Sequence, residues 1–340
     1  MKILVTGGCG YIGSHTSLTL LEHGYEVVVY DNLNNSSVES IHRVEQITGK
    51  SVDIVIGDVC DKDALNKLFK QFDIGAVIHF AALKAVGEST QIPLDYYQNN
   101  VHGSLCLLQA MQESGVVNFI FSSSATVYGE EAPVPYIETM NLGTPSSPYG
   151  ASKVMVERVM MDTAIANSSF RGVSLRYFNP VGAHESGQIG EDPKGIPNNL
   201  LPFVTQVAIG KRDKLSIFGG DYPTSDGTCR RDYLHVMDLA EGHVAALDWL
   251  NNNDDFTGIE AINLGTGNAV SVLEIVHAFE SAYQDKIPYE IAPRRSGDLP
   301  EFWSNADKAK QLLGWVATRN LEQMMVDSWK WQSDNPEGYQ

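Results

Sequence analysis

The stretch Lys2–Ser14, KILVTGGCGYIGS, decides the fold class of this 340-residue chain. Its apolar run Ile3–Thr6 is typical of a buried strand, and a helical pattern from Ser14 to Leu21 follows the glycines. Glycine at positions 7, 10 and 13 permits a tight turn, close approach of the backbone to a pyrophosphate, and contact between helix and strand. An ordinary tight turn is the alternative. We predict a dinucleotide-binding loop, with the anion at the helix N-terminus, built on Gly7, Gly10 and Gly13.

Five more short apolar runs alternate with longer helical patterns through the first half of the chain: Glu26–Tyr30, Asp53–Ile56, Ala76–Phe80, Asn118–Ser122 and Gly172–Arg176. This alternation is typical of βαβ units and a parallel sheet covered on both faces. After about residue 180 the pattern becomes rich in proline and glycine. We therefore predict an α/β protein: a Rossmann-type doubly wound parallel sheet in residues 1–180, a smaller loop-rich α/β substrate-binding domain in residues 181–340, and an active site in the cleft between them.

The composition excludes several classes of partner. With 42 acidic and 24 basic side chains the formal net charge is −18, which repels phosphate backbones and anionic lipid, so neither nucleic acid nor a membrane surface is expected as a partner. No apolar run reaches the length of a membrane span, and no signal segment precedes the glycine loop. The four cysteines lack metal-ligand spacing, which predicts reduced thiols, no metal site and a cytoplasmic location.

Acidic and apolar residues at the strand ends favour NAD as the dinucleotide. Asp31 lies eighteen residues after Gly13, where a carboxylate accepts hydrogen bonds from the adenosine ribose and repels the 2′-phosphate of NADP. A solvated turn aspartate is the alternative. Asp58-Val59 and Phe80-Ala81 follow the next two strands, where they would border the adenine and the stretch from pyrophosphate to ribose.

Three side chains predict hydride chemistry. Tyr149 and Lys153 are four residues apart and therefore share one face of a helix. A free tyrosine titrates near about pH 10, and a neighbouring ammonium and the positive nicotinamide ring would both favour the phenolate. Ser124 follows the strand Asn118–Ser122, so its hydroxyl can reach the same place above the nicotinamide. We predict that Ser124, Tyr149 and Lys153 are catalytic.

These motifs resemble the extended short-chain dehydrogenase/reductase family over the whole chain, from the opening Val5–His15 to the closing Trp329–Trp331. The chain is similar to those members that interconvert UDP-glucose and UDP-galactose at C4. The resemblance implies tightly bound NAD, a 4-keto intermediate, a role in galactose metabolism, a UDP-sugar site in residues 181–340, and a homodimer. One departure is Cys9, at a position often held by serine, which should affect sensitivity to oxidation more than binding.

The resemblance also implies the binding residues. The implied NAD contacts, besides the glycines, are Tyr11, Ile12, Asp31, Asn32, Asn35, Ser36, Asp58, Val59, Phe80, Ala81, Lys84, Asn99, Ser124, Tyr149, Lys153 and Phe178. In similar enzymes two arginines meet the diphosphate of UDP, an aspartate meets the ribose, and an aromatic ring and an asparagine border the uridine. The matching and neighbouring positions here, together with Ser124 and Tyr149, are Arg231, Arg295, Asp298, Phe218, Asn199, Asn179, Leu200, Ser216 and Tyr233.

Two other functions are compatible with this fold. Nucleotide-sugar 4,6-dehydratases carry Asp-Glu directly after the strand-end serine or threonine, as the acid and base that remove the C5 proton and expel the C6 hydroxyl. Ala125 and Thr126 occupy those places here, and neither can act as that acid or base. A silent NAD-binding sensor or scaffold usually lacks the catalytic tyrosine or lysine, and this chain keeps both.

Phe302 is the predicted determinant of substrate range. It lies four residues beyond Asp298, close enough to reach the hexose. In similar enzymes a small residue at this position accompanies acceptance of N-acetylated sugars, and a bulky aromatic accompanies their exclusion. We predict poor conversion of N-acetylated UDP-sugars. The alternative is that Phe302 only packs against Trp303 or the core.

Overall fold

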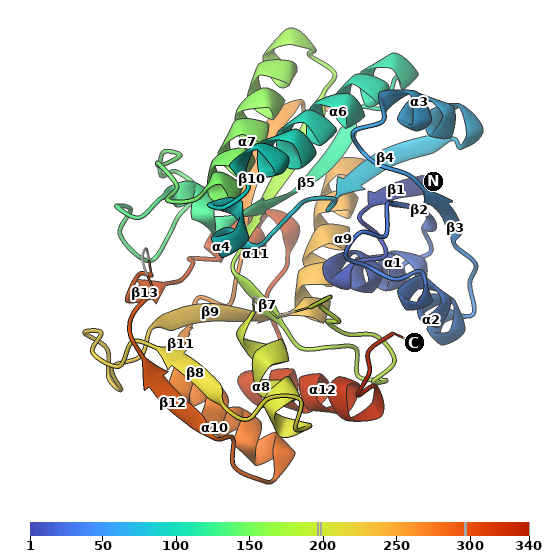
Figure 1. Cartoon of the computed structure of the whole chain (residues 1–340). Coiled ribbons are helices and arrows are strands. Elements are labelled where there is room, and N and C mark those ends of the chain that lie inside the picture. Colours follow the sequence, from blue (N-terminus) through green and yellow to red (C-terminus); the bar gives the residue numbers. More distant parts are fainter. Residues whose placement is uncertain (196, 198, 296–297, 340) are drawn as a thin grey trace.

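A seven-stranded parallel sheet forms the larger part of the molecule (Figure 1). The computed structural model describes residues 1–195, 197, 199–295 and 298–339. The strand order is β10-β6-β5-β4-β1-β2-β3, and it reverses between β1 and β4, the place where open parallel sheets bind ligands. The strands are β1 (Lys2–Thr6), β2 (Glu26–Asp31), β3 (Asp53–Ile56), β4 (Ile74–His79), β5 (Asn118–Ser124), β6 (Arg171–Tyr177) and β10 (Gly258–Leu264).

Helices cover both faces of this sheet (Figure 1). In β1, Ile3 and Val5 belong to the apolar core on one face, whereas Leu4 belongs to the core on the other. Because side chains alternate along a strand and both faces are covered, the strand is an unbroken apolar run. Within the described residues no helix combines the length and apolar character of a membrane span. One face carries α1 (Tyr11–Glu22), α2 (Glu39–Thr48) and α9 (Val236–Asn252), and the other carries α3 (Lys62–Gln71), α6 (Gly103–Ser114) and α7 (Pro148–Ala166).

The smaller part lies beyond the carboxyl edge of the sheet and has its own apolar core (Figure 1). A four-stranded sheet is made of β7 (Asn179–Val181), β9 (Arg230–His235), β11 (Ala269–Ser271) and β13 (Glu301–Phe302). A separate parallel pair joins β8 (Leu215–Phe218) and β12 (Tyr289–Ala292). The helices around this core are α8 (Leu200–Ala208), α10 (Val272–Tyr283) and α12 (Leu321–Asp334). The remaining elements are α4 (Val86–Ser89), α5 (Pro93–Tyr96), the π-helix η1 (Tyr97–His102), the 3₁₀ helix η2 (Ala125–Tyr128) and α11 (Asp307–Leu313).

One buried carboxylate joins three segments of the smaller part. Asp232 on β9 accepts hydrogen bonds from the backbone N–H and hydroxyl of Thr266, at 2.8 and 2.6 Å, and from the N–H of Gly267 at 3.1 Å. The hydroxyl of Ser304 donates to the same carboxylate at 2.7 Å. A buried charge is tolerated when it is hydrogen-bonded in this way. Asp232 therefore fixes β9, and with it the adjacent Arg231, against the segment that carries Phe302.

The predicted fold class is confirmed, and all six predicted strands form, with Phe80 lying just beyond β4. The structure differs from the predicted division at residue 180 in one respect. The seventh strand, β10, pairs with β6, and α9 packs on α1, although both come from the portion assigned to substrate binding. The chain leaves the sheet after β6 and builds β7, α8, β8 and β9 of the smaller part. It then returns to the sheet as α9 and β10, and afterwards adds β11, α10, β12, β13 and α12 to the smaller part. Proline- and glycine-rich loops separate β10 from the first six strands, so the alternation in sequence does not extend to it.

His243 on α9 is buried against the sheet without a polar partner for one ring nitrogen. Its ring lies 4.7 Å from that of Phe80 and 5.6 Å from that of Tyr177. Its Nδ1 contacts the carbonyl of Leu239 at 2.9 Å, and among the described residues Nε2 has no hydrogen-bond partner. Burial lowers the pKa of His243 to about 4 because a charged imidazolium would lose its water there.

This depressed pKa predicts an acid-sensitive contribution to stability. Between pH 6.5 and pH 4 the unfolded chain binds a proton at His243 and the folded chain does not, so the free energy of unfolding falls as the pH falls. At pH 5 the loss relative to pH 7 is about 2 kcal/mol from this residue. Urea unfolding of His243→Leu at both pH values should show a smaller loss than wild type. The exposed His277→Leu is the control, and an equal pH dependence in wild type and His243→Leu would contradict the assignment.

Candidate active site

The glycine loop leaves the N-terminus of α1 open at the carboxyl edge of the sheet. Gly7 has a φ of 69°, and its N–H donates to the carbonyl of Tyr30 at 2.8 Å. A Cβ on Gly13 would lie 2.3 Å from the carbonyl oxygen of Gly7, so only glycine fits there. Gly10 precedes α1 and offers no side chain to cap it. The first backbone N–H groups of α1 are therefore available to an anion.

Asp31 lies beside this loop, at the end of β2. Its carboxylate accepts hydrogen bonds from the backbone N–H of Cys9 at 3.0 Å, from that of Leu33 at 2.8 Å, and from the hydroxyl of Ser36 at 2.7 Å. The carboxylate is thus held at the place predicted for the ribose contact.

Cys9 itself is buried, and burial, with the Asp31 charge adding to it, raises the pKa of its thiol to about 12. Because the thiolate is the form that oxidises, this environment argues against the oxidation sensitivity expected from the sequence.

The adenine and ribose border is built from the ends of β3 and β4. Asn32 donates to the carboxylate of Asp58 at 3.0 Å, which draws the loop after β2 toward the loop after β3. Val59 is buried beside Gly103 at the start of α6. The N–H groups of Phe80 and Ala81 both donate to the carbonyl of Thr6, at 3.0 and 3.1 Å. Asn35 lies in the loop after β2, and Asn99 lies in η1, where it donates to Asn100 at 2.9 Å.

The three predicted catalytic side chains lie on β5 and α7. Ser124 ends β5, and its hydroxyl oxygen accepts hydrogen bonds from the N–H and hydroxyl of Thr126, at 3.2 and 3.0 Å. Tyr149 is the second residue of α7, and Lys153 follows one turn later. The Lys153 Nζ donates to the carbonyl of Ser122 at 2.6 Å and lies 5.8 Å from the centre of the Tyr149 ring. The spacing predicted from sequence therefore brings the group together.

Burial sets the charge state of this group. Burial raises the pKa of Tyr149, while a hydrogen bond with the Ser124 side chain opposes that shift. Burial lowers the pKa of Lys153 to about 7, and the charge of Glu157 acts in the opposite direction. Without a further cation nearby, Tyr149 is a neutral phenol at neutral pH. A positive nicotinamide ring is a cation of the kind that would favour the phenolate.

A buried ion pair that sequence reasoning missed supports the catalytic helix. Glu157 on α7 pairs with Arg176 on β6 at 2.6 Å and also accepts a hydrogen bond from the hydroxyl of Ser123 at 2.5 Å. Both charged side chains are almost fully buried. Arg176 further donates to the hydroxyl of Tyr128 at 3.2 Å. The signal available in the sequence was a glutamate four residues after Lys153 and an arginine inside an apolar strand.

Four of the predicted UDP contacts meet in one cluster. Asp298 pairs with Arg231 at 3.3 Å through one carboxylate oxygen and with Arg295 at 2.9 Å through the other. The guanidinium of Arg295 lies 4.9 Å from the centre of the Phe218 ring, which is partly exposed. An aromatic face, two guanidinium groups and one carboxylate are suited to a base, a diphosphate and a ribose, respectively.

Within the described residues, the other predicted substrate residues form no side-chain hydrogen bond with that cluster, but the charges of Arg231, Arg295 and Asp298 all act on the pKa of the buried Tyr233. Asn199 donates to Glu191 at 2.7 Å. Asn179 on β7 pairs in register with Tyr233 on β9. Leu200 begins α8, and Ser216 on β8 donates to Glu290 at 3.4 Å.

Phe302 lies on β13, paired in register with Arg231. Its ring packs edge-to-face on that of Tyr136, with centres 5.1 Å apart, and lies 5.3 Å from that of Phe178. Phe302 is partly buried and borders the apolar cluster that contains both rings. Phe302 therefore does pack against the core, which was the alternative considered from sequence. This packing places its ring beside Phe178, a predicted NAD contact.

Comparisons with known proteins agree with this geometry. A family model described as GDP-mannose 4,6 dehydratase matches residues 4–328. The UDP-glucose 4-epimerase of Erwinia amylovora is 59% identical over 99% of each chain, and that of Haemophilus influenzae is 56% identical over 100% of this chain and 99% of its own. The UDP-glucose 4-epimerase of Bifidobacterium longum, solved in complex with NAD+ and UDP, is 48% identical, covers 99% of this chain and 100% of its own, and has a TM-score of 0.96.

The parallel sheet, the glycine loop and the serine–tyrosine–lysine group define an extended short-chain dehydrogenase/reductase. Within that class, the chain belongs to the UDP-glucose 4-epimerase family.

The position of Asp31 predicts a test of cofactor choice. Asp31→Ala removes the carboxylate that would hold the ribose hydroxyls and repel a 2′-phosphate, so NAD affinity should fall about tenfold or more while NADP affinity changes less. Binding of both dinucleotides to apoprotein, measured by calorimetry, checks this. Ser37→Ala, in the same loop, is the control. If the variant kept both the NAD content and the NAD preference of wild type, the assignment of Asp31 as a cofactor contact would be wrong.

Proposed function

We propose that the protein is an NAD-dependent isomerase that interconverts UDP-glucose and UDP-galactose at C4 through a 4-keto intermediate. The observation that carries this proposal is the group of Ser124, Tyr149 and Lys153, in which Ser124 and Lys153 are buried, in a chain that also has an open glycine loop and a cluster of Arg231, Asp298 and Arg295. The named relatives support the same reaction. The role in galactose metabolism rests on the resemblance.

The residues of the cofactor side fit NAD. The close contact of Gly13 with Gly7 makes the turn before α1 tight, and the uncapped N-terminus of α1 favours the charge of a pyrophosphate. Asp31 favours a free ribose over a 2′-phosphate. NAD, when bound, supplies the acceptor and donor of the C4 hydride. The other proposed contacts are those named from the sequence, among them Asn35, Asn99 and Phe178.

Tyr149 is the proposed acid and base. A carbon that bears no acidic hydrogen cannot be inverted by deprotonation alone, so C4 must become a ketone and be reduced again. Tyr149 takes the C4 hydroxyl proton and later returns it, and Ser124 holds that hydroxyl. Lys153 stays buried beside the Tyr149 ring, where a protonated ammonium stabilises the phenolate. Tyr149 is partly buried, which limits the access of bulk water to this proton.

The substrate side is proposed to hold UDP firmly and the hexose loosely. Arg231 and Arg295 bind the diphosphate, Asp298 binds the ribose, and Phe218 borders the uridine. In the structure both arginines are paired with Asp298, so the anion of a UDP-sugar would compete with that carboxylate for them. A hexose held mainly through its nucleotide can turn and present the other face of its C4 ketone.

A 4,6-dehydratase is the nearest alternative, and the description of the matching family model raises it. Dehydration requires an acid and a base directly after Ser124. Ala125 is fully buried, and the Thr126 hydroxyl donates to Ser124 at 3.0 Å, so neither place provides a carboxyl group. This observation favours epimerisation. Incubation with UDP-galactose followed by chromatography distinguishes the two, because only a dehydratase releases a 4-keto-6-deoxy sugar.

A silent NAD-binding scaffold is the alternative from another class. Bound cofactor that gains NADH-like absorbance after UDP-galactose is added would support the enzyme, and an unchanged spectrum would support the scaffold. We further propose that the protein works as a homodimer in the cytoplasm. The dimer rests on the resemblance, and the location is supported by the four free cysteines of the described chain.

Tyr149→Phe tests the proton acceptor. The change removes one hydroxyl and keeps the buried ring, so the fold and NAD content should stay close to wild type. Turnover of UDP-galactose should fall by at least about a hundredfold, the scale of a lost general base. Tyr97→Phe, on the partly exposed helix η1, is the matched control. If Tyr149→Phe epimerised UDP-galactose at close to the wild-type rate, the base would have to be a residue other than Tyr149.

Phe302→Cys tests the substrate range. The wild-type ring fills space beside Phe178 and Tyr136, and an acetamido group on C2 enlarges the body that must turn. We expect wild type to convert UDP-galactose but hardly its N-acetylated relative, and Phe302→Cys to convert both. Rates on both substrates provide the measurement.

The control for lost aromatic packing is Phe256→Cys, whose ring packs on Trp249 away from the site. Two results would refute the role of Phe302: comparable wild-type rates on the two substrates, or no gain of N-acetylated activity in Phe302→Cys.

A further inference from the structure

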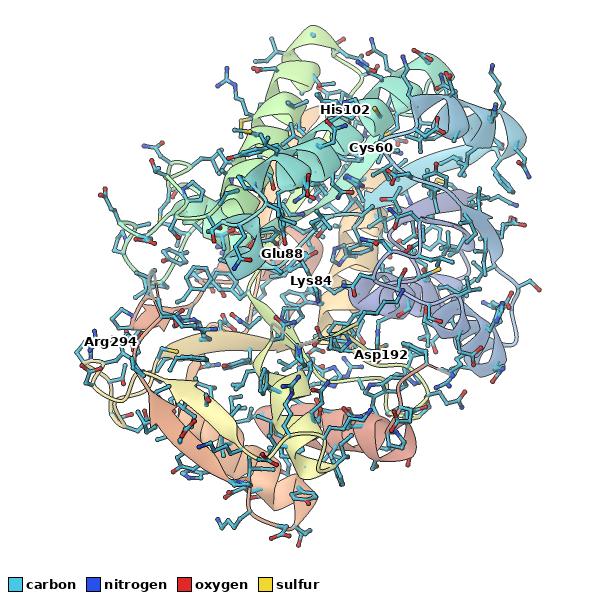
Figure 2. The ribbon with its side chains drawn as sticks, viewed as in Figure 1. Cys60, Lys84, Glu88, His102, Asp192 and Arg294 are labelled. Carbon is cyan, nitrogen blue, oxygen red and sulfur yellow. The ribbon has the colours of Figure 1, made fainter. Side chains whose placement is uncertain are left out.

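One glutamate connects the proposed cofactor side with the proposed substrate side. Glu191 Oε1 accepts a hydrogen bond from the Lys84 ammonium at 3.1 Å and another from the Asn199 amide at 2.7 Å. Lys84 follows β4 in the larger part, and Asn199 directly precedes α8 in the smaller part. Figure 2 labels Lys84 near the middle of the molecule and Asp192, the sequence neighbour of Glu191, below it. A single oxygen atom therefore holds side chains from both parts.

The backbone of Glu191 is held by the end of the chain. Trp331 on α12 donates its indole N–H to the carbonyl of Glu191 at 3.1 Å. The preceding Gly190 lies so close to Trp331 that a Cβ there would fall 2.3 Å from the ring, and its N–H donates to the hydroxyl of Tyr339 at 3.0 Å. The Glu191 side chain is only 10% exposed. The shared oxygen thus belongs to a largely buried side chain whose backbone is anchored, while its position depends on the two donors.

This geometry orients both donors without using up their hydrogen-bonding capacity. A carboxylate only accepts hydrogen bonds, so the Asn199 amide must turn its nitrogen toward Glu191 and its Oδ1 away. The Lys84 ammonium has three donors and uses one on Glu191, which leaves two. Glu191 also lies close enough to Tyr11 that its charge adds to burial in raising the pKa of that phenol. Tyr11 is the first residue of α1, the helix whose N-terminus is predicted to meet the pyrophosphate.

We propose that Glu191 is a positioning residue that couples NAD binding to UDP binding. This proposal rests on the proposed function, which assigns Lys84 to the cofactor and Asn199 to the nucleotide sugar. When UDP fixes Asn199, the Glu191 carboxylate is fixed with it and holds Lys84 toward NAD. Coupling between two ligands is reciprocal, so UDP strengthens the binding of NAD by the same factor by which NAD strengthens the binding of UDP. We expect the tighter binding of NAD to appear mainly as slower release.

The test measures the exchange of bound NAD for radiolabelled NAD, with and without saturating UDP, in the full-length protein. UDP should slow the exchange at least about fivefold in wild type, the lower end of typical coupling between sites. In Glu191→Ala the slowing should fall below about twofold, because both donors lose their common acceptor. Glu191→Gln keeps an acceptor oxygen at the same place and should restore part of the effect, which a merely structural role would not predict.

Matched variants separate coupling from stability. Glu337→Ala removes a different lysine–glutamate pair, Lys211 with Glu337 at 3.0 Å, and should keep the wild-type slowing. Lys84→Ala should abolish the slowing, and adding Glu191→Ala to it should change nothing further. Wild-type slowing retained in Glu191→Ala, or no slowing in wild type, would overturn the proposal. Failure of the proposed function is distinguishable, because it would appear as no conversion of UDP-galactose by the same wild-type preparation.

Discussion

The proposed cofactor side depends on the close backbone contacts of two glycines between β1 and α1. A methyl group on Gly13 would overlap the carbonyl of Gly7, and one on Gly7 would lie 2.7 Å from the backbone nitrogen of Ala81. Because these positions carry no side chain, α1 begins close to the ends of β1 and β4. That placement brings the helix N-terminus, the end of β2 with Asp31 and the end of β4 to one edge. Every other feature of the site is arranged around it.

The catalytic group illustrates how burial and charge are balanced at that edge. Lys153 and Tyr149 both lose water on folding, and each loss disfavours the charged form. The Glu157 carboxylate partly offsets this for Lys153, and Arg176 in turn neutralises Glu157. The chain thus places Tyr149, the proposed proton acceptor, where its charge depends on Lys153 and on what binds beside it.

Much of the fold and part of the site could be predicted from sequence because the signals were local. The glycine loop lies in one turn, the six strands are contiguous apolar runs, and Tyr149 and Lys153 are one helical turn apart. The strand β10 could not be placed from the sequence, because its partner β6 is about eighty residues earlier. The loops between them contain no pattern that predicts that the chain comes back to the parallel sheet. The pairing of Arg231 and Arg295 through Asp298, and of Lys84 and Asn199 through Glu191, depends on tertiary contacts between distant segments. Residue types indicated each group, but not which groups share a partner.

The return of the chain to the sheet has a consequence for how the two parts can be separated. The smaller part is not a tail that could be cut away after residue 180, since α9 and β10 complete the face over α1 and the edge beside β6. A fragment that stops there would expose the apolar surface that α9 covers and leave β6 as an open, aggregation-prone edge. Splitting the gene at that point, or grafting a foreign substrate module there, would therefore have to preserve residues 236–264 as part of the nucleotide-binding half. The smaller part is thus built from two chain segments, one before α9 and one after β10, and both depend on the sheet that this return completes.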